Sequence, residues 1–424
     1  MRAASSPSHP RVTAAPQRGG VDSALIPAPA VPASWPPSLQ VLLGEPAPQL
    51  WSAVLDPLGG RLRTLSPVTV TLRPDAAATV RWTAVVEWAG GRTTRESLAA
   101  TTGAEVPPGA AVVEGDVGGA PVTVGLWRWP LDPALPGLAW AVSAAGTARR
   151  LAELSIDAGA PRLRLRAYRP GRRAVVEVES PAGRWFLKVV RPAAVAGLAA
   201  RHAALAPAVP VPPVLAATDD GVLVLPALPG TPMRAALTGD PAALPPPAAL
   251  EALLDALPAV AAPGRRDPTD PLPRLRGHAA VLGMLCPELS PRLDRLTAAV
   301  AAAAEPQPVV PVHGDFYEAQ LLVDGGAVVG LLDVDTAGPG ARADDRATLL
   351  GHLALLERLA ADPAPVAAYR ARVQEEAGGG ADLGARVAGV LVGLATGPFR
   401  VQQAGWAEAT AARVALAEEE AGLR

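Results

Sequence analysis

The side chains that could do chemistry gather around one predicted hairpin. Two apolar runs, 321–323 and 327–332, are short enough to be buried strands, and the intervening residues 324–326, Asp-Gly-Gly, are typical of a tight turn. A further apolar run, 309–312, predicts another buried strand just before them. Since a hairpin folds back on itself, the residues before its first strand should lie beside those after its second.

Oxygen-bearing side chains occupy both of these neighbouring positions. Asp315 and Gln320 precede the hairpin, whereas Asp333 and Asp335 follow it. Carboxylate and amide oxygens at strand ends make a site of the kind that Mg²⁺ prefers. The sequence therefore predicts an oxygen-rich site at this end of the hairpin. The alternative is that solvated aspartates merely flank an ordinary hairpin.

The spacing resembles the catalytic centre of the aminoglycoside phosphotransferase family, part of the protein-kinase-like superfamily. That family has His-Gly-Asp, four residues, Asn, a hairpin and Ile-Asp; here residues 313–315 are His-Gly-Asp, Gln320 follows after four residues, and residues 332–333 are Leu-Asp. The resemblance implies that Asp315 is the base that orients an acceptor hydroxyl, and that Gln320 and Asp333 bind metal. Gln in place of Asn offers the same carbonyl on a longer side chain and resembles maltokinase-like branches of the family.

Other residues near this centre have expected roles as well. His313 should hold the loop through hydrogen bonds, with a catalytic imidazole as the alternative. Asp335 could line the metal site or the acceptor site. By resemblance, Asp345 buttresses the catalytic loop, while Ala341 stands where relatives carry another acid.

The chain's single lysine lies in a second informative unit, residues 161–190. Alternation and turn residues predict three antiparallel strands there, 162–168, 174–179 and 185–190, and Lys188 lies in the third. The pattern resembles the start of a kinase N-lobe, which implies that Lys188 contacts the α- and β-phosphates of ATP. The alternative is an exposed residue on an edge strand.

The turn between the first two of these strands and the helix after the third depart from the kinase pattern. The turn has one glycine but three arginines, so Arg172 and Arg173 are expected to contact phosphate in place of a glycine-rich loop. A helix over 192–205 stands where kinases have their αC helix. Residues 199–202 in it, Ala-Ala-Arg-His, supply no glutamate to pair with Lys188.

A strand over 221–225 leads into the short linker 226–230, which resembles the hinge between kinase lobes. Backbone groups of Leu225, Ala227 and Leu228 would then bond the adenine edge. A plain connecting loop is the alternative.

These elements predict an α+β, bilobal protein-kinase-like fold with an antiparallel β N-lobe, a mainly helical C-lobe and an extra N-terminal β-rich cap domain. The expected units are a disordered Ala/Pro-rich tail, the cap domain, the N-lobe with its hinge, and the helical C-lobe with the catalytic hairpin, over residues 1–38, 39–155, 156–230 and 231–424. Tryptophans of the cap domain are expected in its core, with a carbohydrate platform as the alternative.

Composition restricts the partners and the compartment. The formal net charge of −2 and pI of about 6.3 give no electrostatic reason to expect nucleic acid or an anionic membrane as partner. A single cysteine, Cys286, excludes an internal disulfide. No apolar run approaches the length of a membrane span or of a signal segment, so a cytoplasmic protein is expected. The oligomeric state stays open.

Together these features predict an enzyme that uses ATP and Mg²⁺ to phosphorylate a hydroxyl of a small molecule, of sugar, aminoglycoside or amino-alcohol type. The rival is a catalytically impaired pseudokinase that serves as a nucleotide-binding or regulatory module, favoured by the missing helix glutamate and by Ala341. A hydrolase is less favoured because the sequence lacks the motifs of serine and zinc hydrolases. A Walker-type NTPase is excluded because no glycine-rich loop precedes Lys188.

Overall fold

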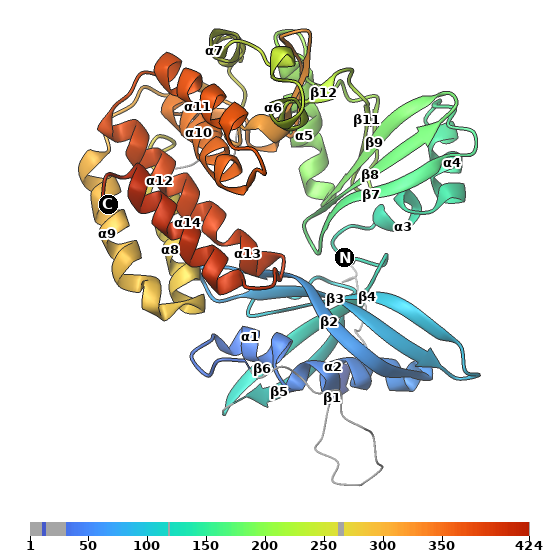
Figure 1. The fold of residues 1–424 in the computed structure, drawn as a ribbon. Coiled ribbons are helices and arrows are strands. Elements are labelled where there is room, and N and C mark those ends of the chain that lie inside the picture. The colour runs from blue at the N-terminus through green and yellow to red at the C-terminus, as the bar shows by residue number, and fades with distance from the viewer. Residues whose placement is uncertain (1–10, 14–30, 118, 262–266, 424) are drawn as a thin grey trace, which may run out of the picture.

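The structure, a computed structural model, describes residues 11–13, 31–117, 119–261 and 267–423. Figure 1 shows an N-terminal sheet with its helices (blue and cyan), a second sheet (green) and a bundle of helices (yellow to red). The predicted α+β fold is confirmed: an antiparallel β N-lobe, a mainly helical C-lobe and an additional β-rich unit at the N-terminus. No helix of the described residues is long and apolar enough to cross a membrane.

The N-terminal unit is a six-stranded sheet with helices on one face. Its order is β1-β5-β6-β4-β3-β2, with bounds β1 Arg11–Thr13, β2 Gly60–Leu72, β3 Ala78–Trp88, β4 Thr93–Thr102, β5 Ala111–Val117 and β6 Ala120–Arg128. Helices α1 (Pro37–Leu43) and α2 (Pro46–Leu55) and the 3₁₀ turn η1 (Asp56–Leu58) precede β2. Trp51 and Trp82 are fully buried and meet edge to face at 5.9 Å, which supports the prediction of a tryptophan core.

The predicted tail, residues 1–38, lies mostly outside the described residues. Its described end is packed against the C-lobe: the buried Trp35 donates its indole N–H to the Leu285 carbonyl at 3.2 Å. The Trp35 ring also lies 5.4 Å from Phe399 and 6.2 Å from Trp406. Residues 31–38 are therefore an ordered part of the contact between the N-terminal unit and the helical lobe.

The N-lobe is a five-stranded sheet of order β10-β11-β9-β8-β7. The bounds are β7 Arg162–Arg169, β8 Arg173–Ser180, β9 Gly183–Val190, β10 Ala216–Ala217 and β11 Val222–Pro226, with helix α5 (Pro192–Leu205) after β9. The three predicted strands and the helix are confirmed.

Two short helices before the N-lobe belong to its core. Leu138 of α3 (Leu138–Ala141) and Leu151 of α4 (Ala144–Glu153) cluster with Val176, Val178 and Leu187 of the sheet. The predicted boundary at residue 155 therefore does not coincide with the packing, because these helices bury their apolar side chains against the N-lobe.

The C-lobe consists of helices and two small sheets. Its helices and 3₁₀ turns are α6 Met233–Thr238, η2 Pro241–Ala243, α7 Pro247–Asp255, α8 Leu272–Leu285, η3 Pro287–Leu289, α9 Ser290–Ala303, η4 Glu318–Gln320, η5 Val334–Thr336, α10 Arg342–Leu359, α11 Ala364–Ala377, α12 Ala381–Ala395, α13 Gly397–Arg400 and α14 Trp406–Glu420. The sheets are β12-β14-β15 (Thr231–Pro232, Leu321–Asp324, Ala327–Leu331) and β13-β16 (Val310–Val312, Gly338–Gly340). The C-lobe is mainly helical, as predicted.

Candidate functional site

The hairpin predicted around residues 324–326 is the scaffold of the site. Strands β14 and β15 pair antiparallel, with Asp324 opposite Ala327 and only Gly325 and Gly326 between them. Both glycines have positive φ, +53° and +81°, as a two-residue hairpin turn requires. The hairpin joins η4 to η5, and the Leu332 N–H donates to the Gln320 carbonyl at 2.8 Å. It therefore brings the residues before and after it together, as predicted.

The loop before the hairpin is fixed by a fully buried carboxylate on α10. Asp345 accepts hydrogen bonds from the backbone N–H groups of His313, at 2.7 Å, and Gly314, at 2.8 Å. Burial raises the pKa of Asp345, while the two backbone donors and the nearby His313 lower it. The buttressing contact that the resemblance implied for Asp345 is thus present.

His313 uses both ring nitrogens within this loop. Its Nε2 lies 2.9 Å from the Leu332 carbonyl, which can only accept, so Nε2 carries the proton. Its Nδ1 then accepts from the Asp315 N–H at 3.3 Å. The imidazole is buried and engaged on both sides, which favours a role in holding the loop over a role as a free catalytic base.

Asp315 lies in the loop before the hairpin, and its carboxylate has no partner among the described residues. Within the described part of the chain this side chain makes no hydrogen bond or ion pair, and it is half-buried. Burial raises the pKa of Asp315, and the negative charge of Asp333 raises it further, against the opposing effect of Arg274. The structure therefore places Asp315 and Asp333 close enough to affect each other's ionisation, and Asp315 has a more basic carboxylate than a solvated aspartate.

A four-member charge cluster connects the two lobes. The Lys188 Nζ donates to Asp333 Oδ1 at 3.0 Å and also to Asp335 Oδ1. Arg173, at the start of β8, spans the same two acids, with Nη1 at 3.2 Å from Asp333 Oδ1 and 3.1 Å from Asp335 Oδ2. Lys188 is buried, so the alternative of an exposed edge residue is excluded.

The cluster controls the ionisation of Asp333. Burial alone would raise the pKa of this carboxyl, but Lys188 and Arg173 outweigh burial and lower the pKa to about 2. Asp333 has the left-handed backbone conformation, φ 55° and ψ 51°, which aspartate and asparagine tolerate better than most residues. The backbone and the charges together hold Asp333 ionised at the junction of β15 and η5.

Gln320 completes the residues expected around a metal. It is buried at the end of η4, and its side-chain amide makes no hydrogen bond with another described residue, whereas its backbone carbonyl does. Across the described residues, no group of three or more His, Cys, Asp or Glu side chains could hold a metal ion alone. Mg²⁺ is commonly held by one or two carboxylates together with phosphate oxygens, so Asp333, Asp335 and Gln320 fit such an ion.

The expected adenine-binding linker pairs partly with the sheet. Leu225 stands opposite Phe186 in the β11–β9 ladder, and the Ala227 N–H donates to the Arg184 carbonyl at 2.9 Å. The Ala227 N–H is thus already bonded within the protein, and the neighbouring Pro226 has no N–H. The Leu228 N–H makes no backbone bond within the described chain and is the donor left for a ligand.

Sequence reasoning did not predict that Asp335 would pair with Lys188. Helix α5 supplies no carboxylate at residues 199–202, and instead its buried His202 bonds the Pro212 carbonyl through Nδ1 at 2.8 Å. The lysine's partners come from η5, on the other lobe. Such a pairing depends on how the lobes meet, which residue spacing does not encode.

Comparison with known proteins finds a family match that begins in β7 and ends in α12. A model of the phosphotransferase enzyme family matches residues 164–388, more than half of the chain. No curated protein matches the chain.

Solved structures give matches of low identity. A macrolide 2′-phosphotransferase from Brachybacterium faecium is 23% identical over 64% of this chain and 97% of its own, with a TM-score of 0.42. A thermostable mutant of an aminoglycoside phosphotransferase is 16% identical over 62% of this chain and 96% of its own, with a TM-score of 0.47. A choline/ethanolamine kinase family protein from Mesorhizobium loti is 15% identical over 61% and 87%, with a TM-score of 0.42.

Proposed function

Because the chain belongs to the phosphotransferase enzyme family, it is a kinase of small molecules, and we propose that it transfers the γ-phosphate of ATP to a hydroxyl group. The observation that carries the proposal is the convergence of Asp315, Asp333, Asp335 and Lys188 at one end of the β14–β15 hairpin. Phosphoryl transfer needs mainly positioning and charge neutralisation, and these four side chains can supply both.

Asp315 is the proposed catalytic base. Its carboxylate is uncommitted, and its raised pKa makes it a better proton acceptor than a solvated aspartate. The hydroxyl hydrogen of the acceptor would be oriented by, or passed to, Asp315. His313 and Asp345 contribute by holding the backbone of this loop in place.

Lys188 and Arg173 are the proposed phosphate-binding cations on the N-lobe side. Both already face acidic oxygens in the cluster within hydrogen-bond distance. Arg172 follows Gly171 on the same turn and is exposed. The Leu228 N–H, with the backbone carbonyls of the linker, is the proposed contact with the adenine edge.

Asp333, Asp335 and Gln320 would hold Mg²⁺, and a bound Mg²⁺ supplies neutralisation of the charge that develops on the phosphate oxygens. The low pKa of Asp333 supports this assignment, because only an ionised carboxylate is a good ligand at neutral pH. Lys188 and Arg173 balance the two acids, so the site carries little net charge of its own. We expect the protein in the cytoplasm, where ATP is available.

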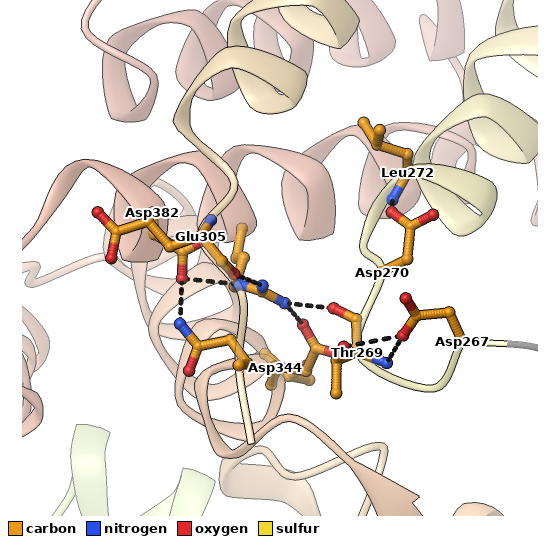
Figure 2. A network of polar contacts seen from close by, with 10 residues as sticks. Asp267, Thr269, Asp270, Leu272, Glu305, Asp344 and Asp382 are labelled. Carbon is orange, nitrogen blue, oxygen red and sulfur yellow. Dashed lines mark hydrogen bonds and ion pairs between the residues drawn. The ribbon is translucent and has the colours of Figure 1, made fainter. Parts of the chain in front are cut away.

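The acceptor is proposed to be an uncharged hydroxyl compound such as a sugar, in preference to a polycationic aminoglycoside. Apart from Asp315, the acids that could attract a cationic acceptor are engaged with protein groups: Asp335 with Lys188, Asp345 with the catalytic loop, and Asp344 with Arg386 at 2.6 Å. Figure 2 shows Asp344 in the polar network that it shares with Asp382. An amino alcohol with a single charge is the second candidate.

The test is a phosphorylation assay with Mg-ATP and a panel of sugars, amino alcohols and aminoglycosides, on the wild-type protein and Asp315→Asn. The variant should lose turnover by roughly 100-fold or more, since general-base catalysis is worth about that much, yet bind ATP as before. Asp324→Asn, at an exposed position of the same hairpin, is the matched control. Normal turnover by Asp315→Asn would remove this residue from the mechanism, and no phosphorylated product with any acceptor would count against the proposed reaction.

A further inference from the structure

The turn between β7 and β8, which is proposed to face the phosphates, has an unusual backbone arrangement for that role. Residues 169–172, Arg-Pro-Gly-Arg, close a tight turn in which the Arg172 N–H donates to the Arg169 carbonyl at 3.0 Å. Gly171 has φ +68° at its third position, which a type II turn requires. The turn is thus set by Pro170 and Gly171, and three arginines surround its tip.

Both polar groups of the Gly171 backbone form hydrogen bonds with side chains of other segments. Its N–H donates to Asp132 Oδ2 at 2.7 Å, and its carbonyl accepts from Arg191 Nε at 2.8 Å. A glycine-rich loop binds phosphate with free backbone N–H groups, but here the N–H of the only glycine in the turn is used by the protein itself. The side chains of the turn are what remains to contact an anion.

Asp132 is a buried carboxylate that holds the Gly171 N–H as one of three hydrogen-bond donors. It is 2% exposed, and it makes no ion pair within the described part of the chain. Its carboxylate accepts from the Tyr168 hydroxyl at 2.9 Å and from the Ala134 N–H at 3.0 Å, besides Gly171. Burying a carboxylate without a cation is costly unless hydrogen bonds compensate, so the three donors explain how the charge is tolerated.

The same network reaches the N-terminal sheet. Trp127, in β6, donates its indole N–H to the Tyr168 oxygen at 3.2 Å, and Trp129 packs on the Tyr168 ring at 4.6 Å. Tyr168 lies at the end of β7, directly before the turn. A continuous set of buried contacts therefore runs from β6 through Tyr168 and Asp132 to Gly171.

The arginines that the turn presents have few anionic partners. Arg173 pairs with Asp333 and Asp335, while Arg169 and Arg172 make no ion pair with any described residue. Partial desolvation of these exposed guanidinium groups lowers the pKa of Arg169 and of Arg172, and the charges of neighbouring arginines lower both further. Such mutual repulsion is relieved when a polyanion binds between the guanidinium groups.

We propose that Asp132 is a positioning residue for the nucleotide phosphates. By holding the Gly171 N–H it fixes the turn so that its arginine side chains, and not its backbone amides, bind the phosphates. Trp127 and Tyr168 make the N-terminal sheet a structural part of the nucleotide site. The inference rests on the proposed use of ATP, and it gives the additional N-terminal unit a specific role in that reaction.

The test compares two probes, Mg-ADP and adenosine, by calorimetry on the full chain. Asp132→Asn loses one charged acceptor while keeping its size, so the affinity for Mg-ADP should fall by about tenfold or more. Adenosine lacks phosphates, and its affinity should stay within about twofold of the wild-type value. Asp157→Asn is the control, because Asp157 also accepts a backbone N–H, that of Gly159 at 3.0 Å, but at an exposed position away from the turn.

If the affinities for both probes fell equally, the proposal would be overturned, because the substitution would have distorted the whole lobe. Unchanged affinities for both probes would also overturn it. If Asp132→Asn does not fold, Tyr168→Phe keeps the ring and removes one donor to Asp132. In this variant the affinity for Mg-ADP should fall roughly threefold, while the affinity for adenosine should stay the same. An unchanged affinity for Mg-ADP would then contradict the proposal. Failure of the wild-type protein to bind Mg-ADP would instead refute the nucleotide-dependent function.

Discussion

Replacing Asp333 by asparagine removes the charge on which the interlobe cluster depends. Asparagine preserves the size of the side chain and tolerates the left-handed backbone at this position, φ 55°, so the substitution isolates the carboxylate. Lys188 and Arg173 would keep only Asp335 as an acidic partner in the cluster. We expect the variant to be less stable at neutral pH and to lose metal-dependent nucleotide binding.

The magnitude follows from the shift in ionisation. The pKa of Asp333 falls from 3.8 to about 2 on folding, and 1.36 kcal/mol per unit converts this shift to about 2 kcal/mol of folding free energy at pH 7. Because the folded-state pKa is depressed, this stabilisation is fully present above the unfolded pKa and is lost as the pH falls through the folded pKa. The difference in stability between wild type and variant should thus be about halved near pH 3 and absent below about pH 2.

The assay is urea denaturation of both proteins between pH 7 and pH 3, with Asp324→Asn as the control because Asp324 is exposed on the same hairpin. Calorimetry with Mg-ADP at pH 7 provides the second readout. A stability difference that does not change with pH would show that the carboxylate charge is not the source of the effect. Wild-type affinity for Mg-ADP in Asp333→Asn would refute the metal assignment.

Three further substitutions test the loop that carries the proposed catalytic base. Asp345→Ala leaves two buried backbone N–H groups without their acceptor, and should lower the free energy of unfolding by about 2–4 kcal/mol in urea titrations. Gly314→Ala should cost about 1–3 kcal/mol in the same titrations, because φ is +79° and the new Cβ would lie 2.8 Å from the Thr336 carbonyl oxygen. Arg234→Met removes the partner of the fully buried Glu318; since Arg234 is half-exposed, a loss of about 1–3 kcal/mol is expected, and an unchanged thermal midpoint would show that Glu318 is held by other groups.

The parts of the site that could be predicted from the sequence are those whose geometry is set by turn residues and apolar patterns of neighbouring segments. The hairpin follows from an Asp-Gly-Gly turn between two apolar runs, and the two positive φ values bear out that reasoning. Lys188 was located because alternation and turns fix three successive strands. In both cases the strands that pair lie within about 20 residues of each other in sequence, where periodicity and turn chemistry determine the geometry.

Contacts between distant segments were not predictable in the same way. Asp132 meets Gly171 across 39 residues, and Lys188 meets Asp335 across 147. Nothing in the residues around Asp132 distinguishes it from an aspartate in an ordinary turn, because its role is set by how the N-lobe packs against the segment before it. The boundary expected at residue 155 does not coincide with the packing for the same reason. Helices α3 and α4 bury their apolar side chains against the N-lobe sheet, and composition does not reveal this contact.

The missing glutamate on α5 changes which part of the protein orients the lysine. A buried ammonium group needs anionic partners, and Lys188 is 5% exposed. In this protein the partners are Asp333 and Asp335, which lie in the segment directly after the catalytic hairpin. Lys188, proposed to bind phosphate, and the proposed metal ligands are therefore one electrostatic unit, which also includes Arg173 of β8. The missing glutamate favoured an impaired pseudokinase. Its absence from α5 is offset, because the acidic partners of Lys188 come from the segment after the hairpin of the C-lobe.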